Sequence, residues 1–236
     1  MSSAAPKARG RIAVIIPTFN EAASIGRVVA ELPRDLVREV VVADGGSSDG
    51  TQERAREAGA RVLDAGRGYG RACLLGAESA DPACDVLCWM DGDGADRGDL
   101  LGRLAAPVLD GAAEFSIASR TRGTREPGAM SWHQVLAGEL TGAGVRLLYG
   151  VRYTDMCAYR VLRRDALPRL ALRETTYGWN LEMQMRAAKL GLRVVEVPMP
   201  YRRRTGGESK VAGSLRGTLR AGTRIAAVFA REMGRR

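Results

Sequence analysis

The chain has 236 residues, of which 45% are apolar, and a formal net charge of +9. This length suits one sizeable α/β domain, and the apolar content excludes a disordered chain. No apolar run approaches the roughly 18 residues that a membrane-spanning helix requires. The four cysteines form no Cys-x-x-Cys pair and His133 is the only histidine, which argues against the usual zinc sites and favours free thiols in a reducing, cytoplasmic location.

The basic charge balance favours an anionic partner. Nucleic acid, an anionic membrane surface and phosphorylated ligands all fit this charge. Aromatic residues make up 5% of the chain, too few for the stacking platforms that hold single strands. The sequence also contains no helix-turn-helix, zinc-finger or RNP motif. We therefore expect no nucleic-acid partner.

The first half of the chain alternates apolar, β-branched runs with amphipathic stretches. The apolar runs predict strands at 11–17, 37–44, 60–63 and 85–90. The amphipathic stretches predict helices at 21–32, 51–58 and 69–79. This order predicts an α/β fold with a mostly parallel central sheet and helices on both faces.

The second half is less regular. It predicts strands at 114–119 and 193–197, a loop at 120–130, and helices at 131–149, 179–190 and 214–233. The sequence shows no internal repeat and no low-complexity linker. We therefore expect a flexible tail at 1–10, a single domain at 11–213 and a basic amphipathic C-terminal helix at 214–236.

The C-terminal helix carries a regular arginine pattern. Arg216, Arg220 and Arg224 recur every four residues, which places them on one face. Apolar residues drift around the other side. Two interpretations fit this pattern: a helix that lies on an anionic membrane surface, and an ordinary helix packed on the sheet with its charges in water. The first would make the protein a peripheral one on the cytoplasmic face of the membrane.

Three polar segments each follow a predicted strand. They occupy residues 17–21, 44–49 and 91–96. In a parallel sheet, ligands bind beyond the carboxyl ends of the strands. The three segments are therefore expected to converge on one binding site.

The last of these segments contains two carboxylates. Asp91 and Asp93 lie two positions apart after a buried strand, and the glycines beside them allow a tight turn. Two hard oxygen ligands in this arrangement suit Mg²⁺ or Mn²⁺, which completes its shell with ligand phosphates. Asp96 is expected to join through water. Asp91 and Asp93 are thus the predicted metal ligands.

Eight short motifs follow one another along the chain. They are IIPTFNE (15–21), ADGGSSDGT (43–51), AGRGYGR (65–71), DGD (91–93), YTD with YR (153–160), YGWNLEMQ (177–184), EVP (196–198) and RRRTGGESK (202–210). With these motifs in this order, the sequence resembles family 2 glycosyltransferases of the GT-A fold, particularly the polyprenyl-phosphate (dolichyl-phosphate-like) sugar synthases, over about residues 11–215.

The resemblance implies a Rossmann-like nucleotide-binding half and an acceptor half. It implies metal-dependent, inverting transfer of a sugar from a UDP- or GDP-sugar to a polyprenyl phosphate, with Asp93 among the catalytic residues. The implied nucleotide-binding residues are Pro17, Thr18, Asn20, Glu21, Asp44, Arg67 and Asp91. The family often has two acids in the second loop, and Gly45 replaces the second here, so the recognition of the base is left open.

Two mechanisms are possible, and they differ in the acceptor that receives the sugar. A polyprenyl phosphate is already anionic and needs cations, for which the candidates are Arg120, Arg160, Arg202, Arg204 and Lys210. A soluble hydroxyl acceptor would instead need a carboxylate base, for which Glu182 and Asp155 are the candidates. Both acceptors remain open, as does assembly into a homo-oligomer. The sequence is less consistent with a nucleotidyltransferase, because segment 17–21 is not the glycine-rich, lysine-containing loop that is typical of that class.

Overall fold

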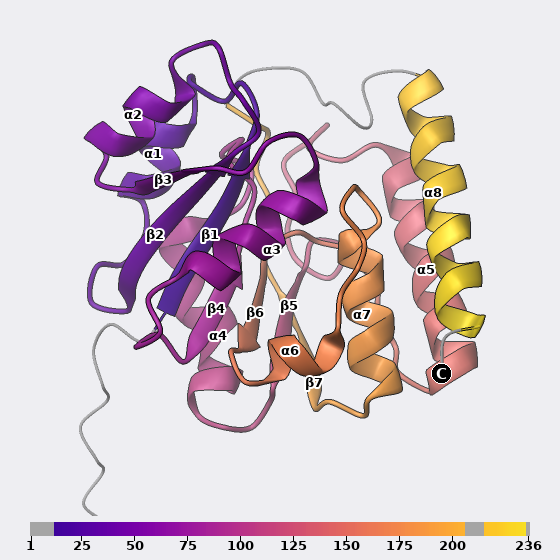
Figure 1. Cartoon of the computed structure of the whole chain (residues 1–236). Coiled ribbons are helices and arrows are strands. Elements are labelled where there is room, and N and C mark those ends of the chain that lie inside the picture. The colour runs from indigo at the N-terminus through magenta and orange to yellow at the C-terminus, as the bar shows by residue number, and fades with distance from the viewer. Residues whose placement is uncertain (1–11, 206–214, 235–236) are drawn as a thin grey trace, which may run out of the picture.

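The computed structural model describes residues 12–205 and 215–234, and its seven strands form one sheet in the order β3-β2-β1-β4-β6-β5-β7 (Figure 1). The strands β1 to β4 pair in parallel, whereas β6 runs antiparallel to both β4 and β5. The strands are β1 (Ile12–Thr18), β2 (Val37–Asp44), β3 (Arg61–Asp64), β4 (Val86–Trp89), β5 (Phe115–Ser119), β6 (Arg160–Arg163) and β7 (Val194–Pro198). The predicted α/β fold with a mostly parallel sheet is confirmed.

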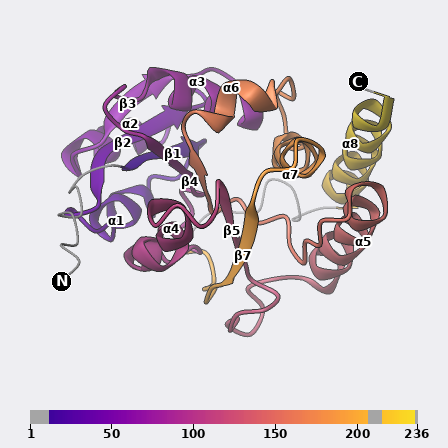
Figure 2. The same ribbon diagram turned by 90° about the horizontal axis from the view of Figure 1, so that it is seen from below.

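The first half has the predicted alternation of strands and helices. Strand β1 is buried along its whole length between β2 and β4, which explains its unbroken apolar run. The helices are α1 (Ile25–Ala30), α2 (Thr51–Glu57) and α3 (Tyr69–Ser79). Viewed from below, α1 and α4 (Leu101–Leu109) lie on one face of the sheet, and α3 and α6 (Ala166–Leu170) on the other (Figure 2).

Three elements of the second half were not predicted from the sequence. Strand β6 has only two apolar residues, Val161 and Leu162, between arginines, so its alternation is too short to recognise. Helix α4 contains Pro107, which usually signals a break. Helix α6 is a single turn of five residues. Tertiary packing decides all three.

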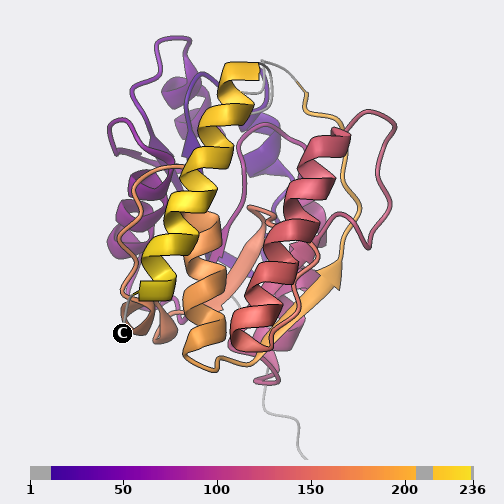
Figure 3. The same cartoon turned by 90° about the vertical axis from the view of Figure 1, so that its right-hand side faces the viewer.

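The remaining helices form a layer beyond β5 and β7. Helix α7 (Trp179–Lys189) lies beside α5 (Trp132–Tyr149) and α8 (Leu215–Gly234), as Figure 3 shows. The rings of Trp89 on β4 and Trp179 on α7 have centroids 5.3 Å apart, and this contact joins the two halves of the core. Within the described ranges, no helix has both the length and the apolar character that crossing a bilayer demands. The predicted tail at 1–10 lies outside the described residues, and the domain boundaries stay a prediction.

Candidate functional site

A cavity of ≈ 1120 Å³ lies where the carboxyl ends of β1, β2 and β4 meet the second half of the chain. The first half contributes side chains from the loops after these strands and from the turn before α3. The second half contributes residues from α5, α7, α8 and the segment after β7. The predicted convergence of the polar loops after β1, β2 and β4 is therefore present, although the loop after β2 reaches the cavity only through Gly45.

Two carboxylates of the loop after β4 face this cavity. Asp91 accepts a hydrogen bond from the hydroxyl of Tyr69 at 3.3 Å. Burial and then the neighbouring charge of Asp93 raise the pKa of Asp91 to about 7. Burial, followed by the charges of Asp91 and Asp93, raises the pKa of Asp96 to about 8. The loop therefore groups acidic side chains whose ionised forms would be stabilised by a cation bound beside them.

The segment after β7 folds against this acidic loop. The guanidinium of Arg204 lies 3.6 Å from the carboxylate of Asp93 and 3.5 Å from that of Glu21. The backbone N–H of Thr205 donates to the carbonyl of Asp93 at 2.9 Å. Arg204, predicted for the acceptor, thus lies at the acidic loop on the donor side.

The acidic loop fits a divalent cation that takes part of its coordination shell from a ligand. Among the residues described, no group of three or more His, Cys, Asp or Glu side chains is arranged to enclose a metal ion. Asp91 and Asp93 both line the cavity and face its open volume. A pair of carboxylates beside open space suits Mg²⁺ or Mn²⁺ whose other ligands are phosphate oxygens and water.

Asp44 and Asn20 hold the loops behind the cavity wall. The fully buried carboxylate of Asp44 accepts hydrogen bonds from the side chains of Thr18, Ser47 and Gln52. Burial raises its pKa, but these bonds outweigh it and leave the pKa of Asp44 below its usual value. The side-chain oxygen of Asn20 accepts a hydrogen bond from the backbone N–H of Ser48, and the backbone of Asn20 has a positive φ of 55°. Neither residue lines the cavity, so the geometry favours a loop-stabilising role over direct nucleotide contact.

The other predicted nucleotide-binding residues do line the cavity. Pro17, Thr18, Glu21 and Arg67 contribute to its wall. The guanidinium of Arg67 stacks 3.5 Å from the centroid of the Phe19 ring. A Cβ atom at Gly45 would lie 3.2 Å from the carbonyl oxygen of Thr18, which explains in part why glycine occupies this position.

Asp155 and Arg120 form an ion pair in the cavity wall. Two nitrogens of the Arg120 guanidinium donate to the Asp155 carboxylate at 2.8 and 2.6 Å, and the Arg120 backbone N–H donates at 2.9 Å. Asp155 is 2% exposed. These three hydrogen bonds occupy the Asp155 carboxylate, so the arrangement disfavours a role for Asp155 as a general base.

Two arginines predicted to bind the acceptor are used elsewhere. Arg160 is fully buried, and its guanidinium donates to the carbonyls of Cys157, Ala158 and Asn180. Arg202 forms an ion pair with Glu31 at 2.7 Å. Neither lines the cavity, and the contacts of both side chains lie within the fold, so the geometry does not favour acceptor binding by either residue. Lys210 lies outside the described residues.

Glu182, a candidate base, also makes its contacts within the fold. Its buried carboxylate accepts the backbone N–H groups of Arg173 and Glu174, and Arg231 of α8 donates to it at 3.1 Å. Its neighbours Asn180 and Leu181 line the cavity, but Glu182 does not. The side chain faces the opposite side of α7 and ties α8 to that helix, away from any acceptor hydroxyl.

Several cavity residues were not identified from the sequence. Tyr69, Asn180 and Tyr201 lie within or beside the family motifs but carry no charge that would single them out. The sequence favours a helix-surface position for His133; the residue is exposed and also borders the cavity from α5. Locating His133 at the cavity requires knowing which side of α5 faces it, and this depends on tertiary packing.

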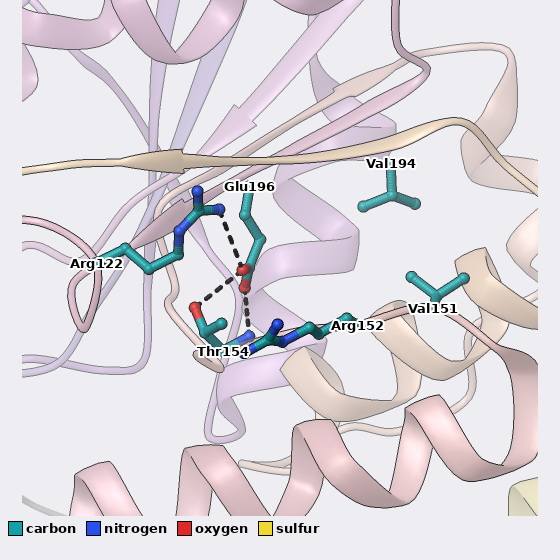
Figure 4. A pocket seen from close by; sticks show the side chains of 6 residues that line it. All are labelled: Arg122, Val151, Arg152, Thr154, Val194 and Glu196. Carbon is teal, nitrogen blue, oxygen red and sulfur yellow. Dashed lines mark hydrogen bonds and ion pairs between the residues drawn. The ribbon is translucent and has the colours of Figure 1, made fainter.

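A smaller hollow of ≈ 440 Å³ lies beside the edge strand β7, and Figure 4 shows its lining. The carboxylate of Glu196 accepts hydrogen bonds from the backbone and side chain of Thr154 and lies 3.9 Å from Arg122. Burial raises the pKa of Glu196. Because these contacts are made within the fold, the hollow does not display a set of groups aimed at a ligand.

Comparisons with known proteins identify the family of this chain. Residues 13–170 match glycosyl transferase family 2. The chain is 34% identical to the undecaprenyl-phosphate mannosyltransferase of Micrococcus luteus, covering 88% of this chain and 90% of that protein. It is 31% identical to the polyprenol monophosphomannose synthase of Mycolicibacterium smegmatis, covering 86% and 82%.

A solved structure shows the same fold. Glucosyl-3-phosphoglycerate synthase from Mycobacterium tuberculosis, in complex with Mn²⁺, UDP-glucose and phosphoglyceric acid, superimposes with a TM-score of 0.75 at 21% identity. The match covers 96% of this chain and 80% of that one. The chain therefore belongs to glycosyl transferase family 2 and is a glycosyltransferase of the GT-A fold.

Proposed function

We propose that the chain transfers a sugar, with inversion, from a UDP- or GDP-sugar to a polyprenyl phosphate, and that Asp91 and Asp93 hold a divalent cation against the donor. The observation that carries the choice of acceptor is the state of the two candidate bases. Asp155 is paired with Arg120, and Glu182 is paired with Arg231. A hydroxyl acceptor needs a free carboxylate base, whereas a phosphate acceptor does not.

The donor's nucleoside diphosphate fits the part of the cavity that is lined by the first half of the chain. When bound there, Mg²⁺ or Mn²⁺ would offset the charge of the departing diphosphate. Arg67 and Arg204 lie in the cavity wall, and their guanidinium groups would donate to the oxygens of the diphosphate. Phe19 and Pro17 offer apolar surface for the nucleoside. Together these residues bind and orient the leaving group.

The bond changes follow from the two anionic partners. An oxygen of the acceptor phosphate forms a bond to the anomeric carbon while the bond from that carbon to the donor's β-phosphate oxygen breaks. The electron pair of the broken bond leaves on the nucleoside diphosphate. Attack from the side opposite the leaving group inverts the anomeric centre. No proton is transferred, so the engaged states of Asp155 and Glu182 are compatible with the reaction.

Two relatives support the lipid acceptor. The proteins from M. luteus and M. smegmatis are named for undecaprenyl-phosphate and polyprenol-phosphate mannosyl transfer, and each match covers more than four fifths of both chains. The structural neighbour named for 3-phosphoglycerate keeps a soluble acceptor as the alternative. At 21% identity that neighbour shows the fold alone.

The decisive experiment is a transfer screen. UDP- and GDP-sugars are each incubated with Mn²⁺ or Mg²⁺ and with either undecaprenyl phosphate in detergent or 3-phosphoglycerate, and products are identified by mass spectrometry. We expect a sugar-phosphate lipid that forms only with metal. A product on 3-phosphoglycerate alone would replace the lipid acceptor with a soluble one, and transfer in EDTA would contradict the metal assignment.

A further inference from the structure

The outer surface of helix α5 carries an unusual concentration of exposed apolar side chains. Nine large apolar residues are exposed in the part of the chain whose side chains are described; five lie on α5 and one, Met233, on α8. Trp132 is 72% exposed, Leu140 64% and Leu147 87%. Exposed apolar residues are ordinary when scattered singly, but a contiguous group marks a contact surface.

Four of the five residues on α5 occupy one face of the helix. Trp132, Leu136, Leu140 and Leu147 recur at spacings of four, four and seven, which brings them into one stripe along the helix. The buried residues of α5, which include Gly138, Thr141, Gly142 and Val145, lie on the opposite face. The stripe therefore points away from the core of the protein.

Helix α8 continues this surface. Its arginines Arg224 and Arg231 turn toward the buried carboxylate of Glu174, with hydrogen bonds of 2.8 and 3.1 Å. Both arginines are partly exposed at the flank of the helix. Between Gly222 and Gly234, the other exposed residues with side chains are uncharged: Thr223, Ala226, Ala227, Ala230 and Met233. The predicted basic face of α8 is thus partly engaged with Glu174, while Arg216 and Arg220 lie where side chains are not described. From Ala226 onward, the exposed side chains away from the two arginines are small or apolar.

The two helices also wall the cavity. His133, Gln134 and Ala137 line it from α5, and Gly222 and Ile225 line it from α8. Figure 3 shows the helices side by side on one side of the molecule. A planar partner that covered both outward surfaces would lie at the edge of the cavity.

We infer that the outward faces of α5 and α8 form a docking surface for an anionic lipid bilayer. Here this face is called the α5–α8 surface, consisting of Trp132, Leu136, Leu140, Leu147, Ala226, Ala230 and Met233. Tryptophan and aliphatic side chains on a helix are the groups that enter the interfacial layer of a membrane. The inference rests on the proposed function, because a bilayer holds a polyprenyl phosphate beside the cavity.

Charge favours a bilayer over a second copy of the chain. Each copy has a net charge of +9, so two copies repel each other, whereas anionic lipid attracts the protein. Exposed arginines flank the stripe at both ends of α5, with Arg125 before the helix and Arg146 and Arg152 near its C-terminus. Basic residues around an apolar centre are typical of a surface that binds anionic lipid.

Trp132 provides a direct measurement. Trp89 and Trp179 are fully buried, so among the three tryptophans a change of fluorescence on lipid binding reports chiefly on Trp132. The full chain is mixed with vesicles of phosphatidylcholine and phosphatidylglycerol that contain neither donor nor acceptor. We expect a blue shift, and quenching by lipids brominated on their acyl chains.

The matched variants alter the surface without touching the cavity. Leu136→Gln, Leu140→Gln and Leu147→Gln are combined in one protein, and Leu190→Gln, at a similarly exposed leucine beyond the end of α7, is the control. We expect vesicle partitioning of the triple variant to fall about tenfold or more, since losing even one leucine contact with lipid has roughly that effect. Circular dichroism and thermal melting verify that all variants fold.

Three outcomes decide the inference. Equal vesicle binding by the triple variant and by wild type would overturn it. So would a wild-type dimer, measured by light scattering, that the same substitutions dissociate while vesicle binding is unchanged. Transfer to undecaprenyl phosphate in detergent separates the two proposals: a chain that transfers the sugar but ignores vesicles contradicts this inference alone, and one that binds vesicles but transfers nothing contradicts the proposed function alone.

Discussion

The acidic residues in the two halves of the chain have different surroundings. In the first half, Asp91, Asp93 and Asp96 lie close together, and the pKa values of Asp91 and Asp96 are raised to about 7 and about 8. In the second half, Asp155, Glu174 and Glu182 are each paired with an arginine, and of these three only Asp155 lines the cavity. The first half thus groups several acids beside Arg204, whereas the second half pairs each of these acids with an arginine.

This difference explains which parts of the molecule are available for chemistry. An excess of carboxylates beside open volume favours a divalent cation. The acids that are paired with arginines make contacts within the fold, which leaves them less available to a ligand. The type of an acidic residue therefore does not indicate its role in this protein. The role depends on whether an arginine lies close enough to pair with it.

The largest expected effect is at the acidic loop. Asp93→Ala should weaken metal-dependent binding of UDP or GDP by about 100-fold or more, because it removes one of two carboxylates from the cation. Calorimetry with and without Mn²⁺ measures this loss. Asp99→Ala, which removes a surface carboxylate paired with Arg97, is the control and should bind normally. Unchanged binding by Asp93→Ala would remove the metal from the donor side.

The acceptor side is tested at Glu182. If its carboxylate serves to hold α8, Glu182→Gln and Arg231→Met should each lower the free energy of unfolding by about 2 kcal/mol, and the double variant should lose less than their sum. Urea denaturation measures the cycle. A collapse of kcat in Glu182→Gln, with stability intact and Arg231→Met fully active, would restore Glu182 as a catalytic base.

Close packing of α5 is the next test. A Cβ atom at Gly142 would overlap the carbonyl oxygen of Tyr153, so Gly142→Ala must displace the helix that walls the cavity. We expect a loss of about 1–3 kcal/mol in the free energy of unfolding, measured by urea denaturation. Gly26→Ala on α1 is the matched control. A Cβ atom at Gly26 would meet no other atom within 4 Å, and the φ of this residue is ordinary, so the substitution should be neutral or slightly stabilising.

The pH dependence of stability isolates the ion pairs of α8. Burial raises the pKa of Glu174, but hydrogen bonds from Thr176, Arg224 and Arg231 outweigh it, so the folded-state pKa lies below the usual 4.5. The ionised group therefore stabilises the fold above about pH 4.5, and this contribution disappears as the pH falls through the folded-state pKa. Glu174→Gln should be less stable than wild type near pH 7 by about 2 kcal/mol. The gap should narrow as the pH falls through the folded-state pKa; a constant gap would show that the charge is unimportant.

The smallest expected effect is at Arg67. Its guanidinium stacks on Phe19, and Arg67→Ala should weaken nucleotide binding about threefold to tenfold through lost contact with anionic oxygens. Binding of UDP and GDP by calorimetry, at low and high salt, measures it. Arg103→Ala on α4, outside the cavity lining, is the control. An effect as large as that of Asp93→Ala would make Arg67 the main anchor of the donor.

Much of the donor half could be predicted because its signals are local. Buried parallel strands such as β1 need continuous apolar residues, and each is followed at once by the polar loop that it positions. Asp91 and Asp93 were identified in this way, and both line the cavity. Asn20 and Asp44 were placed in the correct loops, but their side chains face the neighbouring loop.

The acceptor half depends on contacts between distant residues. Arg231 is 57 positions from Glu174, and Arg202 is 171 positions from Glu31. No local pattern indicates which arginine meets an acid and which faces the cavity, so Arg160, Arg202 and Glu182 were predicted for roles that their surroundings do not support. The same holds for α5, whose exposed and cavity-facing sides become distinct only after the core has formed.

The sequence by itself determined the order of strands and loops up to β4, the class of fold, the family and the acidic turn at 91–93, since each depends on residues that are adjacent along the chain. The tertiary structure alone decided which charges are neutralised, which face of α5 is exposed and where α8 directs its arginines. The physical reason is range: hydrophobic periodicity acts over a few residues, whereas burial and charge pairing depend on which distant segments meet.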